Sequence, residues 1–223
     1  MINTNKFKVR ELKNGEYKQW ILKKHYAKRS CSVSYCFGLI EDTKIIGVCT
    51  FGFPPNFNYN DGKCIFSNYK CLTLELNRLV INNNKEKNLA SFFVSRAIKF
   101  LPKPSTIVSY ADPNQNHKGY VYQALNWIYT GVSTPKKRYT FKDGSTFDIR
   151  RGIDTKGEIV KIEELLPTHR YIFFHADRTD RKKMRKNFKL KIVKYPKGDN
   201  KKYKCIDIDM YYQNSFFDVF EEL

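Results

Sequence analysis

The chain has 223 residues, of which 41% are hydrophobic and 15% aromatic, enough for a buried core. Lysine and arginine number 41 against 22 aspartates and glutamates, so the net charge of +19 favours a polyanionic partner, above all nucleic acid, over a merely basic soluble protein. The absence of a long apolar run, of a secretory leader and of a CxxC pair among the six cysteines predicts a cytoplasmic protein with reduced, mostly buried thiols and no membrane partner.

The first part of the chain predicts an edge strand, a short helix and a hairpin. Residues 7–12 alternate as an edge strand, and residues 16–26 place aromatic and apolar side chains at helical spacing. Two further strands, 34–41 and 44–52, follow as a hairpin. The Pro-, Asn- and Gly-rich stretch 51–70 is longer than a usual structureless connection, so we expect a functional loop there.

The middle of the chain predicts strand, helix, strand and helix. Residues 72–81 form the first strand, and residues 88–101 form a helix with one apolar face. A short buried strand covers residues 105–110. Residues 119–129 then predict a second helix, with Gly131 as its C-cap.

The last part of the chain predicts a hairpin over 138–151, a strand over 168–175 and a very basic helix. No linker or repeat divides the chain, so we expect one catalytic domain over residues 1–198. This domain includes a basic DNA-binding segment, 168–198, and a C-terminal extension follows over residues 199–223.

The order of these elements is similar to that of the GNAT acyltransferases. This similarity implies an α/β fold with a mixed, splayed β-sheet flanked by helices, here with a basic C-terminal extension. In such a fold a coenzyme A thioester lies in the cleft, and backbone amides at a helix N-terminus hold its pyrophosphate. Asparagine tolerates a left-handed backbone, so Asn88 could replace the usual glycine; an ordinary capping turn is the alternative. The residues at this turn are Lys87, Asn88, Leu89, Ala90 and Ser91.

Several stretches resemble the phage Mom family of DNA adenine-modifying proteins. They include HY at 25–26, LELNRLV at 74–80, HRYIFF at 169–174 and, most specifically, SYADPNQNHKGYVYQALNWIYTG at 109–131. The family converts adenine in phage DNA, at the exocyclic amine, to a carbamoylmethyl (acetamido) derivative, which protects the DNA from host restriction nucleases. The resemblance implies an enzyme that uses acetyl-CoA or a related acyl-CoA, acts on double-stranded DNA and works in the host cell cytoplasm.

Polar side chains near the predicted strand ends supply the candidate catalytic groups. His25 could act as a base or as a hydrogen-bond donor. Asp112 could orient or deprotonate an amine, or it could form a turn. Tyr122 could protonate a leaving thiolate, as a tyrosine on this helix does in GNAT enzymes, or simply pack. The candidate catalytic set is His25, Tyr26, Ser109, Asp112 and Tyr122.

Arg78 is the main candidate for donor binding, because it lies in an apolar strand where an unpaired charge is costly. It either pairs with an acid such as Glu75 or contacts the donor. Asn126 could instead read an adenine edge. Besides the helix turn, the candidate cofactor-binding residues are Arg78, Leu79, Val80, Asn126 and Tyr129.

A cluster of basic side chains towards the C-terminus suits phosphate contacts, which give sequence-tolerant affinity for DNA; a solvated charged face is the alternative. His169 and His175 share one face of their strand but have no third partner in view, so we expect no metal site there. The candidate DNA-binding residues are Lys24, Arg170, Arg178, Arg181, Lys182, Lys183, Arg185 and Lys186.

Adenine in duplex DNA is stacked and paired, so an enzyme that modifies it must extrude the base. We expect the aromatic loop 51–69 to form a wall of the base pocket. An ordinary GNAT enzyme transfers an acyl group through its carbonyl carbon, whereas a carbamoylmethyl group attaches through the methyl carbon and carries an extra nitrogen. Two other functions stay open: an N-acetyltransferase for a protein, tRNA or small amine, and a non-catalytic DNA-binding protein on a GNAT-like scaffold.

Overall fold

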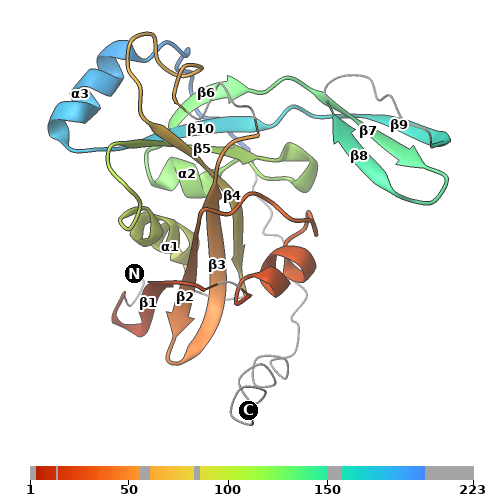
Figure 1. Ribbon diagram of the computed structural model, residues 1–223, viewed down its shortest axis with the longest axis horizontal. Coiled ribbons are helices and arrows are strands. Elements are labelled where there is room, and N and C mark those ends of the chain that lie inside the picture. Colours follow the sequence, from red (N-terminus) through yellow and green to blue (C-terminus); the bar gives the residue numbers. More distant parts are fainter. Residues whose placement is uncertain (1–3, 14, 56–60, 83–85, 150–156, 199–223) are drawn as a thin grey trace.

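A computed structural model describes residues 4–13, 15–55, 61–82, 86–149 and 157–198. Within these residues a seven-stranded mixed sheet forms the body, and a three-stranded sheet projects from one side as an arm (Figure 1). The strand order is β1-β2-β3-β4-β5-β10-β6 in the body and β8-β7-β9 in the arm. Of these residues, no helix is long and apolar enough to cross a membrane.

The body sheet contains β1 (Phe7–Glu11), β2 (Tyr35–Glu41), β3 (Lys44–Gly52), β4 (Leu72–Ile81), β5 (Ser105–Ala111), β6 (Ile128–Val132) and β10 (His169–His175). The arm contains β7 (Lys136–Phe141), β8 (Thr146–Ile149) and β9 (Ile159–Leu165). The helices are α1 (Leu89–Ile98), α2 (Tyr120–Ala124) and α3 (Arg178–Asn187). Short helical turns are η1 (Thr4–Lys6), the π-helical η2 (Trp20–Lys24) and η4 (Pro113–Gln115).

The parallel pair β4 and β5 splays in the middle of the sheet. The two strands pair only from Leu72–Glu75 to Ser105–Val108, although β4 continues to Ile81. The later part of β4 therefore presents a backbone edge that β5 does not use. This geometry confirms the mixed, splayed and GNAT-like sheet that the sequence predicts.

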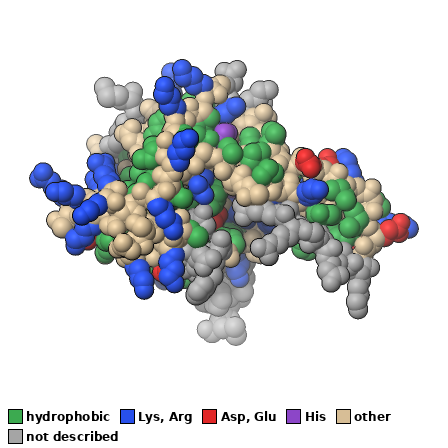
Figure 2. Space-filling view, turned by 90° about the horizontal axis from the view of Figure 1, so that it is seen from above, with side chains coloured by type: hydrophobic (Ala, Val, Ile, Leu, Met, Phe, Trp, Pro, Cys, Tyr) green, Lys and Arg blue, Asp and Glu red, His purple; other side chains and the backbone are tan. Residues whose placement is uncertain are grey.

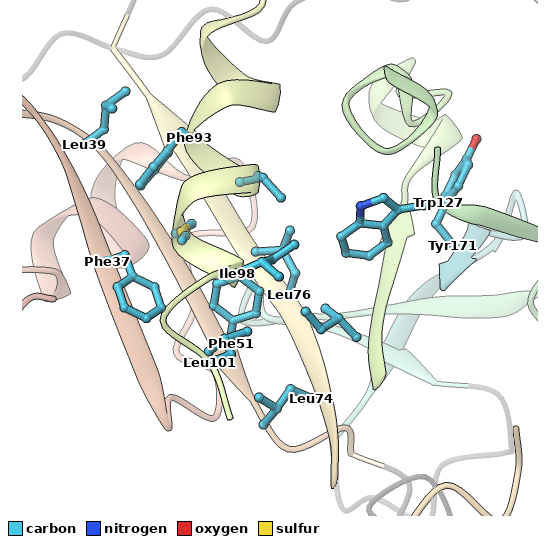
Figure 3. Packing of buried hydrophobic residues seen from close by; sticks show 14 of the residues in the cluster. Phe37, Leu39, Phe51, Leu74, Leu76, Phe93, Ile98, Leu101, Trp127 and Tyr171 are labelled. Atoms are coloured by element: carbon cyan, nitrogen blue, oxygen red, sulfur yellow. The ribbon is translucent and has the colours of Figure 1, made fainter. Parts of the chain in front are cut away.

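The main core lies between the sheet and α1 (Figure 3). The apolar face of α1 contributes Phe93 and Ala97, which are fully buried. Phe37 and Phe51 meet them from the sheet. Trp127 and Tyr171 close the core on the side of α2, and this packing fixes both helices beside the splay.

Two predicted helices are shorter in the structure. The helix predicted over 16–26 is limited to η2, which is preceded by a turn. The helix predicted over 119–129 ends at Ala124, because Asn126 adopts a left-handed backbone (φ 55°) and turns the chain into β6. Tyr129 therefore belongs to a strand, and the prediction that the helix extends to residue 129 is wrong.

The predicted loop 51–69 is not a pocket wall in its described part. Ile65 and Phe66 are buried in a second core together with Phe174 of β10 and Met184 of α3. These apolar side chains gain more by burial than by lining a polar cleft. Residues 56–60 lie outside the described residues, as does the C-terminal extension 199–223.

α3 lies at the opposite end of the sheet from the splay. His169 of β10 pairs with Ala111 near the cleft, and His175 pairs with Ser105 at the far end. The helix starts only after His175, so about 20 Å of strand separates its start from the cleft end.

Candidate active site

A cavity of about 210 Å³ opens where β4 and β5 separate. Its walls come from four segments that are distant in the sequence: Lys24–Tyr26, residues 76–81 of β4, residues 110–111 of β5, and the loop into α2 from His117. No aspartate or glutamate is among the described residues that line it. The cleft is therefore suited to anionic or electron-rich groups.

A β-bulge places Arg78 in this cleft. Thr50 pairs with Arg78 whereas Phe51 pairs with Leu76, so Asn77 is the extra residue. The Asn77 side chain fixes the bulge, since it accepts from Thr50 Oγ1 (2.6 Å) and donates to the carbonyl oxygen of Ser32 (2.6 Å).

Arg78 has main-chain partners in place of an acidic one. Its Nη1 donates to the Asn77 carbonyl (2.7 Å) and its Nη2 to the Arg29 carbonyl (3.3 Å). The Nε atom is buried and has no hydrogen-bond partner in the described structure. In the described part of the chain no acidic residue, Glu75 included, forms an ion pair with it. The two predicted alternatives were an ion pair with an acidic residue and a contact with the donor. The structure favours the second, because no acidic residue of the described structure forms an ion pair with Arg78.

His25 is a buried neutral imidazole. Burial, and then the charge of Arg78, lower the pKa of His25 to about 3. Its Nδ1 lies 3.1 Å from the backbone N–H of Ala27 and accepts a hydrogen bond from it. The ring proton therefore sits on Nε2. As arranged here, His25 offers a hydrogen-bond donor and not the base that the sequence left open.

Aromatic rings line the cleft on the side of His25. The Tyr26 ring lies 4.2 Å from that of His25 and 5.8 Å from that of His117, centroid to centroid. Burial raises the pKa of Tyr26 to about 12, so its hydroxyl stays protonated. Sequence analysis does not identify His117 as a cleft residue, because nothing in the sequence places this loop residue beside Tyr26.

Ser109 bridges the two strands at the point of splay. Its Oγ lies 2.8 Å from the Leu76 carbonyl oxygen and 2.7 Å from the Tyr122 hydroxyl. A carbonyl oxygen can only accept, so Ser109 donates to Leu76 and the Tyr122 hydroxyl donates to Ser109. Burial raises the pKa of Tyr122 to about 12. The Tyr122 proton is thus engaged within the wall.

Asp112 forms the turn that was the alternative to a catalytic role. Its Oδ1 accepts from the backbone N–H of Asn114 (2.9 Å) and from the Asn114 side chain (2.8 Å). It is not among the residues that line the cleft. Asp112 therefore shapes the loop that carries His117, and its negative charge helps to raise the pKa of Tyr26.

The turn before α1 has the predicted backbone. Asn88 adopts φ 64° in the left-handed region, and its side chain makes no capping hydrogen bond. Leu89 is buried in the core, so only its backbone is available to a ligand. Ser91 Oγ donates back to the Asn88 carbonyl (2.9 Å). The left-handed asparagine leaves the first-turn amides arranged as at a glycine turn.

Three of the remaining predicted residues lie in surroundings that differ from those the prediction implied. Lys24 is buried in the cleft, where its Nζ donates to Asn82 (2.9 Å), so it is a cleft residue and not an exposed DNA contact. Asn126 and Tyr129 line a second cavity behind α2, and Tyr129 bonds His169 Nδ1 (2.8 Å). Leu79 and Val80 line the cleft as predicted.

The predicted basic cluster is divided between the sheet and α3. Arg170 donates to Thr130 Oγ1 (2.7 Å) within the sheet, because strand pairing holds it against β6. Arg181 donates to the Ala176 carbonyl (2.9 Å). Many lysine and arginine side chains are spread over the side of the molecule that carries α3, while the arm carries acidic and basic side chains together (Figure 2). The exposed basic residues of α3 are Arg178, Arg181, Lys182, Lys183, Arg185 and Lys186.

His169 and His175 make separate hydrogen bonds, His175 to the Leu101 carbonyl (3.0 Å). Among the described residues, no group of three or more His, Cys, Asp or Glu side chains is placed to hold a metal ion.

The splayed sheet, its cleft and the helix turn beside it define a GNAT-like protein. Solved structures of similar fold include an N-acetyltransferase from Staphylococcus aureus Mu50 (TM-score 0.43, 18% identity, 75% of this chain and 98% of that chain). Another is yncA, a putative acetyltransferase from Salmonella typhimurium with its cofactor acetyl-CoA (TM-score 0.44, 12% identity, 77% and 95%).

The model of the Mom protein family matches residues 6–197, and the chain belongs to that family. Among curated proteins, the methylcarbamoylase mom of Escherichia phage Mu is 26% identical over 188 residues, which cover 78% of this chain and 77% of that protein.

Proposed function

We propose that this protein is a DNA-modifying transferase that adds a carbamoylmethyl (acetamido) group to the exocyclic amine of adenine. In the host cytoplasm this modification would protect phage DNA from restriction nucleases. Family membership and the name of the phage Mu relative support the reaction class, and the net charge of +19 supports DNA as the substrate. The observation that carries the proposal is the half-buried Arg78 side chain, whose buried Nε has no hydrogen-bond partner in the described structure and which lines a cleft without acidic residues among the described ones.

The cleft fits acetyl-CoA or a related acyl-CoA. Strand pairing between β4 and β5 ends at Glu75, and a strand edge of this kind suits the amides of a pantetheine chain. Asn88 sets the first turn of α1 for a pyrophosphate, and Arg78 adds a fixed positive charge. When bound, the thioester supplies an activated two-carbon unit.

The acceptor side of the cleft fits an extruded base. The rings of His25, Tyr26 and His117 offer stacking and edge contacts to adenine. A DNA base enters an active site only when it is unstacked, and an aromatic wall compensates for the stacking that is lost.

The chain's own groups stabilise negative charge and supply a proton. His25 donates through Nε2, Arg78 adds its charge, and Tyr26 keeps its proton because its pKa is about 12. A carbonyl oxygen held by the first two groups becomes more electrophilic at the adjacent carbon. Acyl transfer at that carbon, with the CoA thiol as leaving group, would give an N-acetyl group. The carbamoylmethyl product instead requires a C–N bond at the methyl carbon, which is a two-electron oxidation, and exchange of the thiol for an ammonia-level nitrogen, so the reaction also takes a two-electron oxidant and a nitrogen donor as co-substrates.

Mass spectrometry of nucleosides tests this proposal. DNA from cells that express the protein should contain a deoxyadenosine carrying one carbamoylmethyl group. The Tyr26→Phe variant should lose most of this product, and Tyr35→Phe, on β2 away from the cleft, should keep it. Unmodified adenine in DNA from cells with folded, soluble protein would refute the function. An N-acetylated protein, tRNA or small amine would instead support a conventional acetyltransferase.

A further inference from the structure

A second, larger cavity of about 690 Å³ lies on the other side of α2. It is an open cavity bordered by β6, by α2 and by residues 192–198 of the segment 189–198, which we call the strap. Tyr120 lines both this cavity and the cleft, so the two spaces are neighbours. The volume is in the range of small-molecule and cofactor sites.

Hydrogen bonds hold the strap against the sheet edge. The Val193 N–H donates to the Tyr129 carbonyl (3.1 Å), and the Tyr195 hydroxyl donates to the Trp127 carbonyl (2.7 Å). The Tyr120 hydroxyl donates to the Gly198 carbonyl. These three contacts are spaced along the strap, so the cavity has fixed walls.

The lining combines rings, amides and lysines. Tyr120 and Tyr195 are about 40% exposed (41% and 39%) and are accessible for stacking. Asn126 adds an amide group, and Gln123 adds an amide oxygen, because its Nε2 already donates to the Lys118 carbonyl and to the Tyr171 hydroxyl (both 3.0 Å). Lys194 and Lys197 are exposed at the rim. Rings that stack, amides that pair with base edges and cations that hold phosphate together match a nucleotide.

The strap also connects the basic helix to the cleft. α3 lies at the far end of the sheet, and the chain after it returns along β6 to Tyr120 at the cleft. Lysines recur along this return path, at 189, 191, 194 and 197. A DNA strand that follows these charges from α3 reaches the second cavity before it reaches the cleft.

We propose that the second cavity binds an unstacked nucleotide of the DNA strand that carries the target adenine. The proposal rests on the proposed function for DNA as the substrate. The cavity holds the neighbouring nucleotide while the target base occupies the cleft, and Tyr120 separates the two. Extrusion of one base leaves its neighbour without a stacking partner, and the tyrosines replace that partner.

Photo-crosslinking to duplex DNA in which 5-iodo-deoxyuridine replaces thymidine tests the site, because a halogenated base crosslinks to an aromatic ring stacked on it. We expect crosslinked peptides that contain Tyr195 or Tyr120. Tyr195→Phe should keep the crosslink at position 195 and Tyr195→Leu should lose it. Tyr195→Leu should also lower modification about tenfold or more. Fluorescence anisotropy with the same DNA measures binding in each sample.

A charge-matched pair of variants separates the strap from general electrostatics. Lys194→Ala/Lys197→Ala and Lys182→Ala/Lys183→Ala remove the same charge, but only the first pair should reduce the crosslink per bound DNA. Crosslinks confined to α3 or to Tyr26, with DNA bound and modified, would overturn this proposal alone. Loss of the crosslinks on addition of CoA, with DNA still bound, would assign the cavity to the donor's nucleotide and likewise overturn it. Crosslinks at Tyr195 with unmodified adenine would support the cavity and refute the proposed reaction.

Discussion

Replacing Arg78 by alanine should abolish most activity at little cost in stability. Breaking a buried ion pair costs about 3–5 kcal/mol, but within the described residues Arg78 donates to main-chain carbonyls alone, at 2.7, 3.3 and 3.5 Å. Loss of these contacts should cost about 1–2 kcal/mol, or roughly 2–8 °C in Tm for a chain of this size. A lost charge-assisted contact to a bound anion is worth about 1.5–3 kcal/mol, so kcat/KM should fall about 10- to 150-fold.

Thermal unfolding, DNA-binding anisotropy and nucleoside mass spectrometry on the same preparations check this prediction. Arg10→Ala is the matched control, because Arg10 pairs with Glu16 on the edge strand, at 2.7 and 3.3 Å, away from the cleft. It should keep full activity. DNA binding should be close to wild type in both variants. Wild-type modification by folded Arg78→Ala, or a stability loss of 3–5 kcal/mol, would refute the reasoning and make Arg78 a structural residue.

Three further predictions address α3, His25 and Gly119. Lys182→Glu/Lys183→Glu should weaken DNA binding and flatten its salt dependence, while Lys142→Glu on the arm should not; equal salt slopes would contradict the role of α3. Burial lowers the pKa of His25 to about 3, so the folded protein keeps this histidine neutral. As the pH falls below ~6.5, the unfolded chain takes up a proton here that the folded protein does not, and the free energy of unfolding drops by up to about 1.4 kcal/mol per pH unit. Urea unfolding at pH 7 and pH 5 should show a smaller loss for His25→Gln than for wild type, and equal losses would contradict the assigned burial. Gly119→Ala should destabilise more than Gly144→Ala by about 1–3 kcal/mol, because both have φ near 80° but only at Gly119 would a Cβ meet the Tyr171 ring, at 2.4 Å; equal Tm losses would contradict this packing.

Most of the strands and their order along the chain follow from the sequence because each has an apolar pattern of its own, whereas β6 and β9 were not predicted. β2 and β3 alternate around a two-residue turn, and β4, α1 and β5 keep their predicted places to within a few residues. Asn88 could be read as left-handed because few residues tolerate that backbone. The GNAT-like order of the elements also implies a splayed sheet with a cleft, and the structure has such a cleft between β4 and β5.

Features that depend on long-range contacts could not be read in this way. The bulge at Asn77 exists because Ser32 and Thr50 bind its side chain, and no local signal in β4 marks it. The early end of α2 depends on Asn126, since the apolar residues that follow suit a helix or a strand equally well. Lys24 appeared to be one more surface cation, yet its position against Trp20 and Asn82 buries it.

The cleft as a whole favours stabilisation of an anion over removal of a proton before attack. His25 is a neutral donor, Tyr26 and Tyr122 hold their protons, and Arg78 is a fixed cation, while Asp112 is engaged in its turn. Adenine's amine is weakly nucleophilic but neutral, so in an attack on the thioester carbonyl, the step that leads to an N-acetyl group, it needs no prior deprotonation if the negative charge that develops on the carbonyl oxygen is stabilised. Its proton becomes acidic only after the new bond forms, and a weak acceptor or water can then remove it. Substitution of Arg78 or His25 should therefore lower the rate of bond formation at every pH where the protein is folded, with no bell-shaped dependence near the ordinary pKa of histidine.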